Sequence, residues 1–471
     1  MLAEQIAFDP KSPAPALAQL PHKPGVFALF AADPRAEPYL SRTTDLRRRI
    51  TRFLDARPDQ TRRLQLAEKV ARIEYTATGS DLESTLVLYS ASFQAFGERA
   101  RKRLRLAPPA FIRFAAQNPY PRAYVTTKLA RAAGNHLYGP FPSRLAAERY
   151  LDEALNLFLL RRCTFELDPD PAFPGCVYSE MKMCLAPCFK GCTDERYAEE
   201  AARVEAFLAT RGASLLNALA AERDAASEAM KFEEAAALHA RYQKVHSVTG
   251  LVAEVVRPLA TLRATLVMPA AEPFHVALFS LEAGRLSGPA LYSVVGMRHP
   301  NEQSGSSSLF AHPFALEPVP LAEAVQLANE PRSGPPSLPP EPTISPESSL
   351  FVSAAQAVSG TSAEIQRETR REKSQAKGIL EARLDEAFAS LAASALEIPN
   401  QQTISDHLCM FKRWYYRPTA NRTGEVVFHE PNATAPTKAI LRAISRVFRG
   451  ATAPAAGILT SGTQTSTMVK L

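Results

Sequence analysis

The chain of 471 residues is 46% hydrophobic and carries 55 Lys and Arg against 48 Asp and Glu, a net charge of +7. At ~100–200 residues per domain this length predicts about two to four domains, and the apolar content excludes a chain without a folded core. The basic balance fits an anionic partner such as nucleic acid. Because no stretch approaches the ~20 apolar residues of a membrane helix and Met1–Pro10 has no signal-peptide pattern, we expect a cytoplasmic protein without a membrane partner.

Two short strands and an arginine-bearing helix are predicted near the N-terminus. Gly25–Ala31 is typical of a buried strand and Pro38–Arg42 of a second one. Thr44 or Asp45 can cap a helix through Leu54, because their side-chain oxygens accept hydrogen bonds from the free amides of the first turn. This helix would carry a cluster of cations: Arg47, Arg48, Arg49 and Arg52.

Helices are predicted for much of the middle of the chain and strands for the part after it. A strand over Arg72–Ala77 and a helical stretch from Ser80 follow the arginine-bearing helix. Ser143–Arg162 has apolar residues mostly at i+3 and i+4 intervals, and residues 194–248 are rich in Ala and Glu, which favours helices. Residues 260–297 alternate in the way that strands do.

These patterns predict an α+β fold: a small mixed sheet with helices, then a cysteine-rich region, a helical hairpin and a β-containing part after a proline-rich linker. The predicted boundaries are an irregular lead-in (1–21), a first domain (22–118), a cysteine-rich region (119–195), a helical region (196–250), a small β region (260–312), a Pro/Ser-rich linker (313–350), a charged helix (351–398), a small basic and aromatic β module (399–450) and a flexible tail (451–471).

Five of the six cysteines fall between Cys163 and Cys192, and this clustering requires a chemical reason. Four of them, Cys163, Cys176, Cys184 and Cys188, lie within 26 residues. Thiolates at such spacing can hold an iron–sulfur cluster or a structural zinc ion, because both are soft metal centres. A disulfide framework is not expected in a reducing compartment. Reduced free cysteines are the alternative, with Cys192 as a spare ligand.

A motif near residue 230, MKFEEAAAL over Met230–Leu238, interrupts one helix and starts another. Glu233 and Glu234 favour the N-terminus of the second helix, where the helix dipole is positive. The pattern predicts a short antiparallel helix hairpin. Such a hairpin either docks on a partner or packs on its own domain.

The C-terminal part has one basic and aromatic run and few acids. Phe411–Arg417 could stack bases and neutralise phosphates, or its rings could form a small core on a strand. Beyond residue 225 the only aspartates are Asp385 and Asp406, so no cluster of acidic metal ligands is predicted there.

The N-terminal segment PGVF…YLSRTTDLRRR resembles the GIY-YIG nuclease domain of the UvrC family of excinucleases, whose motif is PGVY…YIGKAxxLxxR. The resemblance implies that Tyr39 and Arg49 are catalytic, with Mg²⁺ or Mn²⁺ needed if the nuclease is active. Arg42 replaces the motif lysine. Glu98 can replace the family's metal-binding glutamate only if the alignment contains an insertion. Four other positions depart from the motif: Phe27 at the first tyrosine, Ser41 at a glycine, Leu88 at the metal-binding glutamate and Phe111 at an asparagine.

The cysteine and hairpin motifs resemble the same family. MKMCLAPC stands where the family has GRCLGPC, which implies a [4Fe–4S] cluster, with zinc as the alternative, on Cys163, Cys176, Cys184 and Cys188. MKFEEAA resembles the UVR motif LEFEEAA, which implies docking on UvrB, and indirectly on UvrA, through Phe232, Glu233, Glu234 and Ala235.

Over about residues 22–250 these resemblances predict a UvrC-like component of bacterial nucleotide excision repair. It would bind UvrB through the hairpin and DNA through Arg42, Arg47, Arg48 and Arg52. Because the metal-binding glutamate is not at its expected position, we expect a weakened or inactive phosphodiesterase. The alternative is a non-catalytic accessory or regulatory protein that binds DNA or UvrB on the same scaffold.

Overall fold

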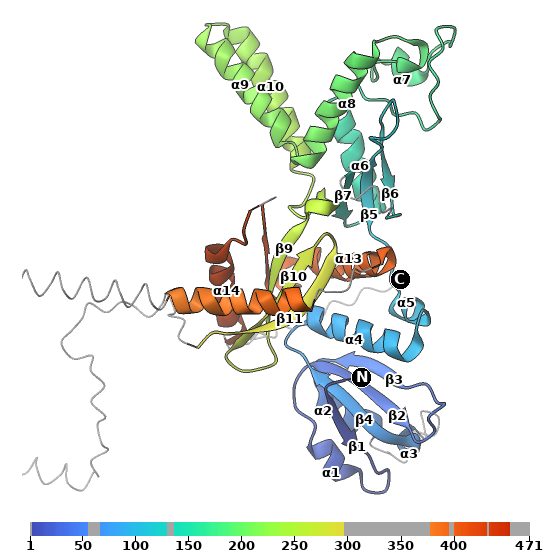
Figure 1. Ribbon diagram of the computed structural model, residues 1–471, viewed down its shortest axis with the longest axis vertical. Coiled ribbons are helices and arrows are strands. Elements are labelled where there is room, and N and C mark those ends of the chain that lie inside the picture. Colours follow the sequence, from blue (N-terminus) through green and yellow to red (C-terminus); the bar gives the residue numbers. More distant parts are fainter. Residues whose placement is uncertain are drawn as a thin grey trace, which may run out of the picture. The chain divides into compact units, whose positions relative to one another are not determined.

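The computed structural model describes residues 2–54, 66–129, 136–295, 377–394, 400–430 and 433–452. The chain divides into one unit formed by Met1–Val295 with Arg383–Leu471 and a second formed by Gly296–Ala382, of which residues 377–382 are described. No helix among the described residues is long and apolar enough to cross a membrane. The strands of the described part form three antiparallel sheets, accompanied by helices (Figure 1).

The first sheet has the strand order β1-β4-β2-β3. Its strands are β1 (Glu4–Ala7), β2 (Gly25–Ala31), β3 (Tyr39–Thr43) and β4 (Val70–Ala77). Helix α2 (Leu46–Leu54) packs on it because Leu46, Ile50 and Leu54 recur at four-residue spacing and form one apolar face. This face joins a buried core with Phe27 and Ile73.

The irregular lead-in predicted over residues 1–21 is wrong. Glu4 lies opposite Tyr75, so β1 extends the sheet, and α1 (Pro13–Ala18) has proline in its first turn. A strand of four residues contains too little alternation to be recognised in the sequence. Proline at the start of a helix loses no intrahelical hydrogen bond, so it begins α1 and does not interrupt it.

Helices α4 (Asp81–Phe96) and α5 (Arg99–Leu104) follow the first sheet. The Ser80 hydroxyl accepts from the amide of Glu83 at 3.1 Å, and the Glu83 carboxylate accepts from the amide of Gly79 at 2.8 Å. These bonds satisfy amides that the start of a helix leaves free.

The second sheet has the order β6-β5-β7-β8, formed by β5 (Ala110–Phe114), β6 (Ala123–Thr126), β7 (Leu137–Phe141) and β8 (Arg257–Pro258). Helix α6 (Arg144–Leu155) packs on it. The first domain, predicted to run to residue 118, therefore ends before β5, because this strand lies inside the second sheet. Phe111 is fully buried there. Pro108 and Pro109, directly before β5, indicate a break in regular structure, but not which sheet the next strand joins.

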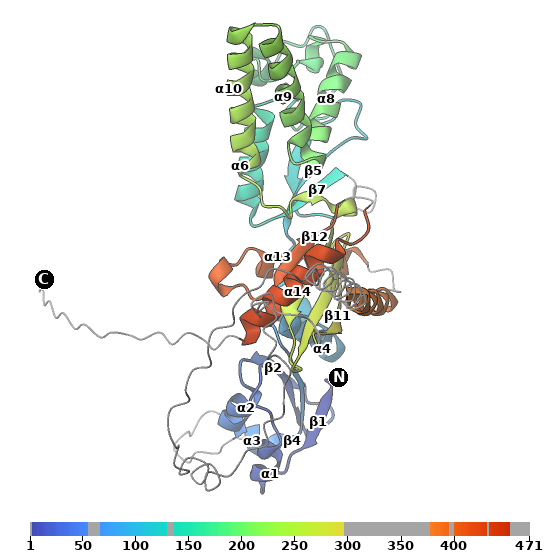
Figure 2. The same cartoon turned by 90° about the vertical axis from the view of Figure 1, so that its left-hand side faces the viewer.

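The helical region contains α8 (Asp194–Ala209), α9 (Ala213–Glu228) and α10 (Phe232–Thr249). Helices α9 and α10 lie side by side in both ribbon views (Figures 1 and 2), as the predicted hairpin requires. Gly212 begins the turn into α9 with φ 89°, and a Cβ there would lie 2.2 Å from Cγ2 of Thr249. Glycine is therefore required at this position.

The third sheet has the order β11-β10-β9-β12, formed by β9 (Arg263–Pro269), β10 (His275–Glu282), β11 (Arg285–Ser293) and β12 (Glu425–Phe428). Val426 lies opposite Leu266, so segments more than 130 residues apart in the sequence form one sheet. Helices α13 (Gln401–Tyr415) and α14 (Thr437–Thr452) accompany it, as do the helical residues 383–393.

The separate β module predicted over residues 399–450 is wrong. Phe411–Tyr415, the aromatic part of the predicted strand, is the last turn of α13. Its aromatic residues favour strands locally, but Leu408, Phe411 and Trp414 recur every three residues and bury one face of a helix. The Pro/Ser-rich linker, most of the predicted charged helix and the tail beyond α14 lie outside the described residues.

Candidate functional site

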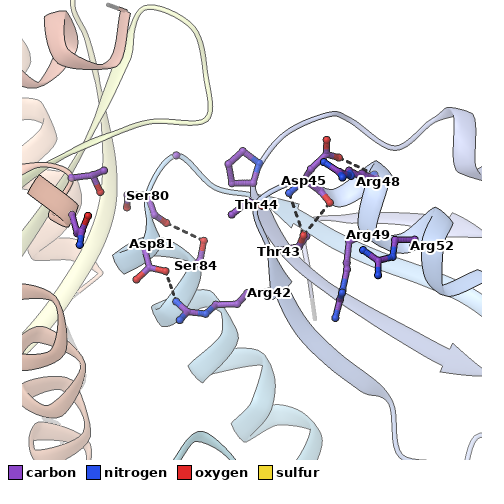
Figure 3. Close-up of a pocket in the computed structure, with 14 residues that line it drawn as sticks. Arg42, Thr43, Thr44, Asp45, Arg48, Arg49, Arg52, Ser80, Asp81 and Ser84 are labelled. Carbon is purple, nitrogen blue, oxygen red and sulfur yellow. Dashed lines mark hydrogen bonds and ion pairs between the residues drawn. The ribbon is translucent and has the colours of Figure 1, made fainter. Parts of the chain in front are cut away.

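A cavity of about 650 Å³ opens beside β3, α2 and the start of α4 (Figure 3). Four arginines line it: Arg42, Arg48, Arg49 and Arg52. Hydroxyl, amide and carboxylate groups complete the polar lining: Thr43, Thr44, Asp45, Ser80, Asp81, Ser84, Asn421 and Thr423. Such a surface, rich in guanidinium and hydroxyl donors, is suited to the oxygens of a phosphate.

The arginines face the cavity because the opposite side of α2 is apolar. Leu46, Ile50 and Leu54 bury one face of the helix, which leaves Arg48, Arg49 and Arg52 exposed on the other. Arg47, which the sequence also predicts to bind DNA, is half-buried and does not line the cavity. No signal in the sequence marks Asn421 and Thr423, which reach the cavity from the far end of the chain.

Asp45 holds the start of α2 beside these cations. Its Oδ1 accepts from the amide of Arg48 at 2.8 Å, and its Oδ2 lies 3.1 Å from Nδ1 of His22. The amide of Arg48, with His22, lowers the pKa of the Asp45 carboxyl. The Asp45 carboxylate thus caps the start of α2.

Tyr39 and Arg49, the two predicted catalytic residues, meet at one aromatic ring. The rings of Tyr39 and Phe53 are 5.3 Å apart, and Cζ of Arg49 lies 4.6 Å from the centre of the Phe53 ring. Phe27 is fully buried behind Tyr39, with ring centres 6.1 Å apart. The cluster therefore has one exposed hydroxyl where the family motif has two tyrosines.

Leu88 and Glu98, the two positions that could correspond to the metal-binding carboxylate, lie in different surroundings. Leu88 lines a second cavity of about 240 Å³ together with Arg42 and Asp81. The Glu98 side chain is 79% exposed, pairs with Arg101 and lines neither cavity. Among the described residues, no group of three or more His, Cys, Asp or Glu could hold a metal ion. Leu88 supplies no oxygen ligand, so the side chain at this position does not fit the Mg²⁺ or Mn²⁺ that the resemblance implies.

The clustered cysteines lie on the segment between α6 and α8. Cys176 precedes α7 (Val177–Glu180), and Cys188 lies in the short helix η2 (Pro187–Phe189). Burial raises the pKa of Cys184 to about 11, and the nearby thiols of Cys163, Cys176 and Cys188 add to the shift. The donor type fits a soft metal centre, although these thiols are not arranged as a formed ligand set among the described residues.

The tip of the α9–α10 hairpin presents two large apolar side chains to solvent. Met230 is 77% exposed and Phe232 is 68% exposed. Glu233 and Glu234 are also exposed, Ala235 is half-buried, and Lys231 pairs with Glu234 at 3.4 Å. Met230 has φ 57°, which ends α9 and turns the chain into α10.

Comparison with known proteins finds one family model and a set of curated relatives that are similar to parts of this chain. Residues 110–207 match the family described as UvrC/Cho excinuclease, middle domain. This match begins at β5, where the second sheet begins. No solved structure matches the chain.

The curated relatives are proteins named UvrABC system protein C. The chain is 28% identical to that of Proteus mirabilis over 243 residues, which are 51% of this chain and 39% of the relative. It is 29% identical to that of Stenotrophomonas maltophilia over 232 residues, 49% of this chain and 37% of the relative. The chain thus matches well under half the length of these relatives. About half of this chain is thus similar to proteins named UvrABC system protein C.

Proposed function

We propose that the protein is a UvrC-like component of nucleotide excision repair that binds DNA at the arginine-lined cavity and does not cut it. The four arginines of this cavity, beside the start of α4, are the observation that supports DNA binding. Guanidinium groups attract the phosphate backbone independently of base sequence, so the site would position DNA without selecting a base.

The residues around the cavity support the proposed absence of cutting. A divalent metal would act as a Lewis acid on the scissile phosphate, and it needs a carboxylate to hold it. Leu88 offers no ligand, Asp45 caps α2 through the amide of Arg48, and Asp81 faces the guanidinium groups of Arg42 and Arg417, which repel a cation. Tyr39 and Arg49 can still orient a phosphate by hydrogen bonding and charge. A non-catalytic accessory role is therefore favoured over incision.

Binding of duplex DNA is expected to weaken steeply with salt. Each neutralised phosphate contributes about −0.9 to the slope of log Kobs against log salt, so four arginines predict a slope of about −3 to −4. Arg52→Gln should reduce its magnitude by about 1. Fluorescence anisotropy over a salt series measures both. Arg144→Gln, which removes an exposed arginine paired with Glu148 on α6, is the control. A flat salt dependence of the unmodified protein would contradict DNA binding.

The hairpin supports a second part of the proposal, docking on UvrB. Phe232→Ala is expected to weaken binding to the C-terminal hairpin of UvrB by about 1–3 kcal/mol, the range for losing a central aromatic anchor. Isothermal titration measures this change. Phe274→Ala removes another exposed phenylalanine, on the loop before β10, and should leave binding unchanged. If the unmodified protein does not bind the UvrB hairpin, α9 and α10 serve only their own domain.

The cysteine segment is proposed to hold a [4Fe–4S] cluster, with zinc as the alternative, through Cys163, Cys176, Cys184 and Cys188. Protein purified without oxygen should be brown and contain ~4 iron and ~4 sulfide per chain. Cys184→Ser should abolish the colour, whereas Cys409→Ser, a buried cysteine on α13, should retain it. If the protein is colourless and contains one zinc ion per chain, the cysteines hold a structural zinc ion and not an iron–sulfur cluster.

A further inference from the structure

Asp81 lies between two arginines from distant parts of the chain. Its Oδ1 accepts from Nη1 of Arg42, on β3, and its Oδ2 lies 2.7 Å from Nη2 of Arg417, which follows α13. Oγ1 of Thr85 also accepts from Nη1 of Arg42, at 3.0 Å. Two guanidinium groups thus converge on one carboxylate, and Figure 3 shows Arg42 reaching it.

The three side chains remain accessible to a ligand. Asp81 is 37% exposed, Arg42 42% and Arg417 34%. Ion pairs at this exposure are screened by water and salt, so they contribute little to stability and can be exchanged. An incoming anion could therefore replace the Asp81 carboxylate without disturbing the packed core.

The surroundings favour an anion of higher charge than a single carboxylate. Among the described residues, a single acid, Asp81, lines the cavity that contains Leu88, together with four arginines: Arg42, Arg103, Arg413 and Arg417. Of these, Arg103 also pairs with Glu37. Arg42 and Asp81 also line the larger cavity beside α2, so the two cavities share these residues. Guanidinium groups bind phosphate oxygens in the same two-point geometry as carboxylate oxygens.

We propose that Arg42 and Arg417 form a composite phosphate-binding site, and that Asp81 occupies it as an intramolecular substitute until a DNA backbone phosphate replaces it. The site joins the first sheet to the segment after α13, so that the C-terminal part of the chain takes part in DNA binding. A phosphate of a DNA strand is favoured over free phosphate because the site continues into the arginine-lined cavity. The proposal rests on the proposed DNA binding.

Two substitutions with opposite expected effects test this site in the full chain. Arg417→Gln should weaken binding of labelled duplex about eightfold at 0.1 M salt, because one phosphate contact contributes about 0.9 to the salt slope. Asp81→Asn should tighten binding and make the slope steeper, because both arginines lose their competing anion. Asparagine keeps the polar side chain at the start of α4. Arg417→Lys should restore part of the slope. Fluorescence of Trp414 during urea unfolding checks that each variant is folded.

The outcomes separate this site from the proposed function. If Asp81→Asn weakens DNA binding as Arg417→Gln does, the ion pairs of Asp81 with Arg42 and Arg417 are only structural and the proposal is wrong. If both variants bind like the unmodified protein while Arg52→Gln binds less tightly, DNA binds at α2 alone, which overturns this site and leaves the proposed function intact. If the unmodified protein does not bind DNA, both proposals fail. Displacement of DNA by 1 mM inorganic phosphate at constant ionic strength would overturn the assignment to a DNA phosphate.

Discussion

Replacing Asp406 by alanine is expected to lower the free energy of unfolding by about 3 kcal/mol, at the lower end of the ~3–5 kcal/mol found when one partner of a buried ion pair is removed. The Asp406 side chain is 3% exposed, and its Oδ2 accepts from Nε of Arg101 at 2.9 Å and from the hydroxyl of Tyr89 at 3.3 Å. Burial, with the charge of Asp406, raises the pKa of Tyr89 to about 12, so its hydroxyl remains a donor. Alanine would leave both donors without this acceptor.

The control for Asp406 is the second partner of Arg101, Glu98, which pairs with it at the surface. Glu98→Ala removes an exposed partner of the same arginine and should cost about 0–1 kcal/mol. Trp414, the only tryptophan, is buried on the same helix as Asp406, so its fluorescence reports unfolding of this region in urea. Equal losses for the two variants would contradict the view that Asp406 anchors α13 to α4 and α5.

Incision of damaged duplex in the presence of UvrA, UvrB and Mg²⁺ or Mn²⁺ is expected to be undetectable. By the resemblance to the GIY-YIG motif, Leu88 stands at the position of the metal-binding glutamate, and its side chain cannot coordinate a cation. Leu88→Glu should restore only traces of cutting, because the four arginines of that cavity would compete with the metal ion for the new carboxylate. Phe27 would still lack the hydroxyl of the first motif tyrosine. Gel analysis of end-labelled duplex measures the products.

Glu98→Gln is the decisive comparison in the same assay. Because Glu98 is exposed, pairs with Arg101 and lines neither cavity, this substitution should leave the amount of cleaved DNA unchanged. Clear cutting by the unmodified protein that Glu98→Gln abolishes would make Glu98 the metal ligand and refute the inactive site. Cutting that survives Glu98→Gln would indicate a catalytic site elsewhere in the chain.

The sequence alone determined the elements whose signals are local. Leu46, Ile50 and Leu54 at four-residue spacing indicate α2, and the same spacing exposes its arginines. Asp45 and Ser80 mark the starts of α2 and α4, because their side-chain oxygens cap free amides. The clustered cysteines and the hairpin motif are likewise contiguous in the chain. Each of these signals depends on residues within a few turns of one another.

Only the tertiary structure decided which distant segments meet. Phe411–Tyr415 has strand-like composition, but packing of Leu408, Phe411 and Trp414 makes it helical. The pairing of β12 with β9 and the placement of β5 in the second sheet depend on long-range hydrogen bonds that local propensity does not encode. Asp81 meets Arg417 across more than 330 residues for the same reason. The proposed DNA-binding site therefore has two parts. The arginines on α2 are placed by a helical repeat, whereas the part from the C-terminal segment lies there only because α13 packs against α4 and α5.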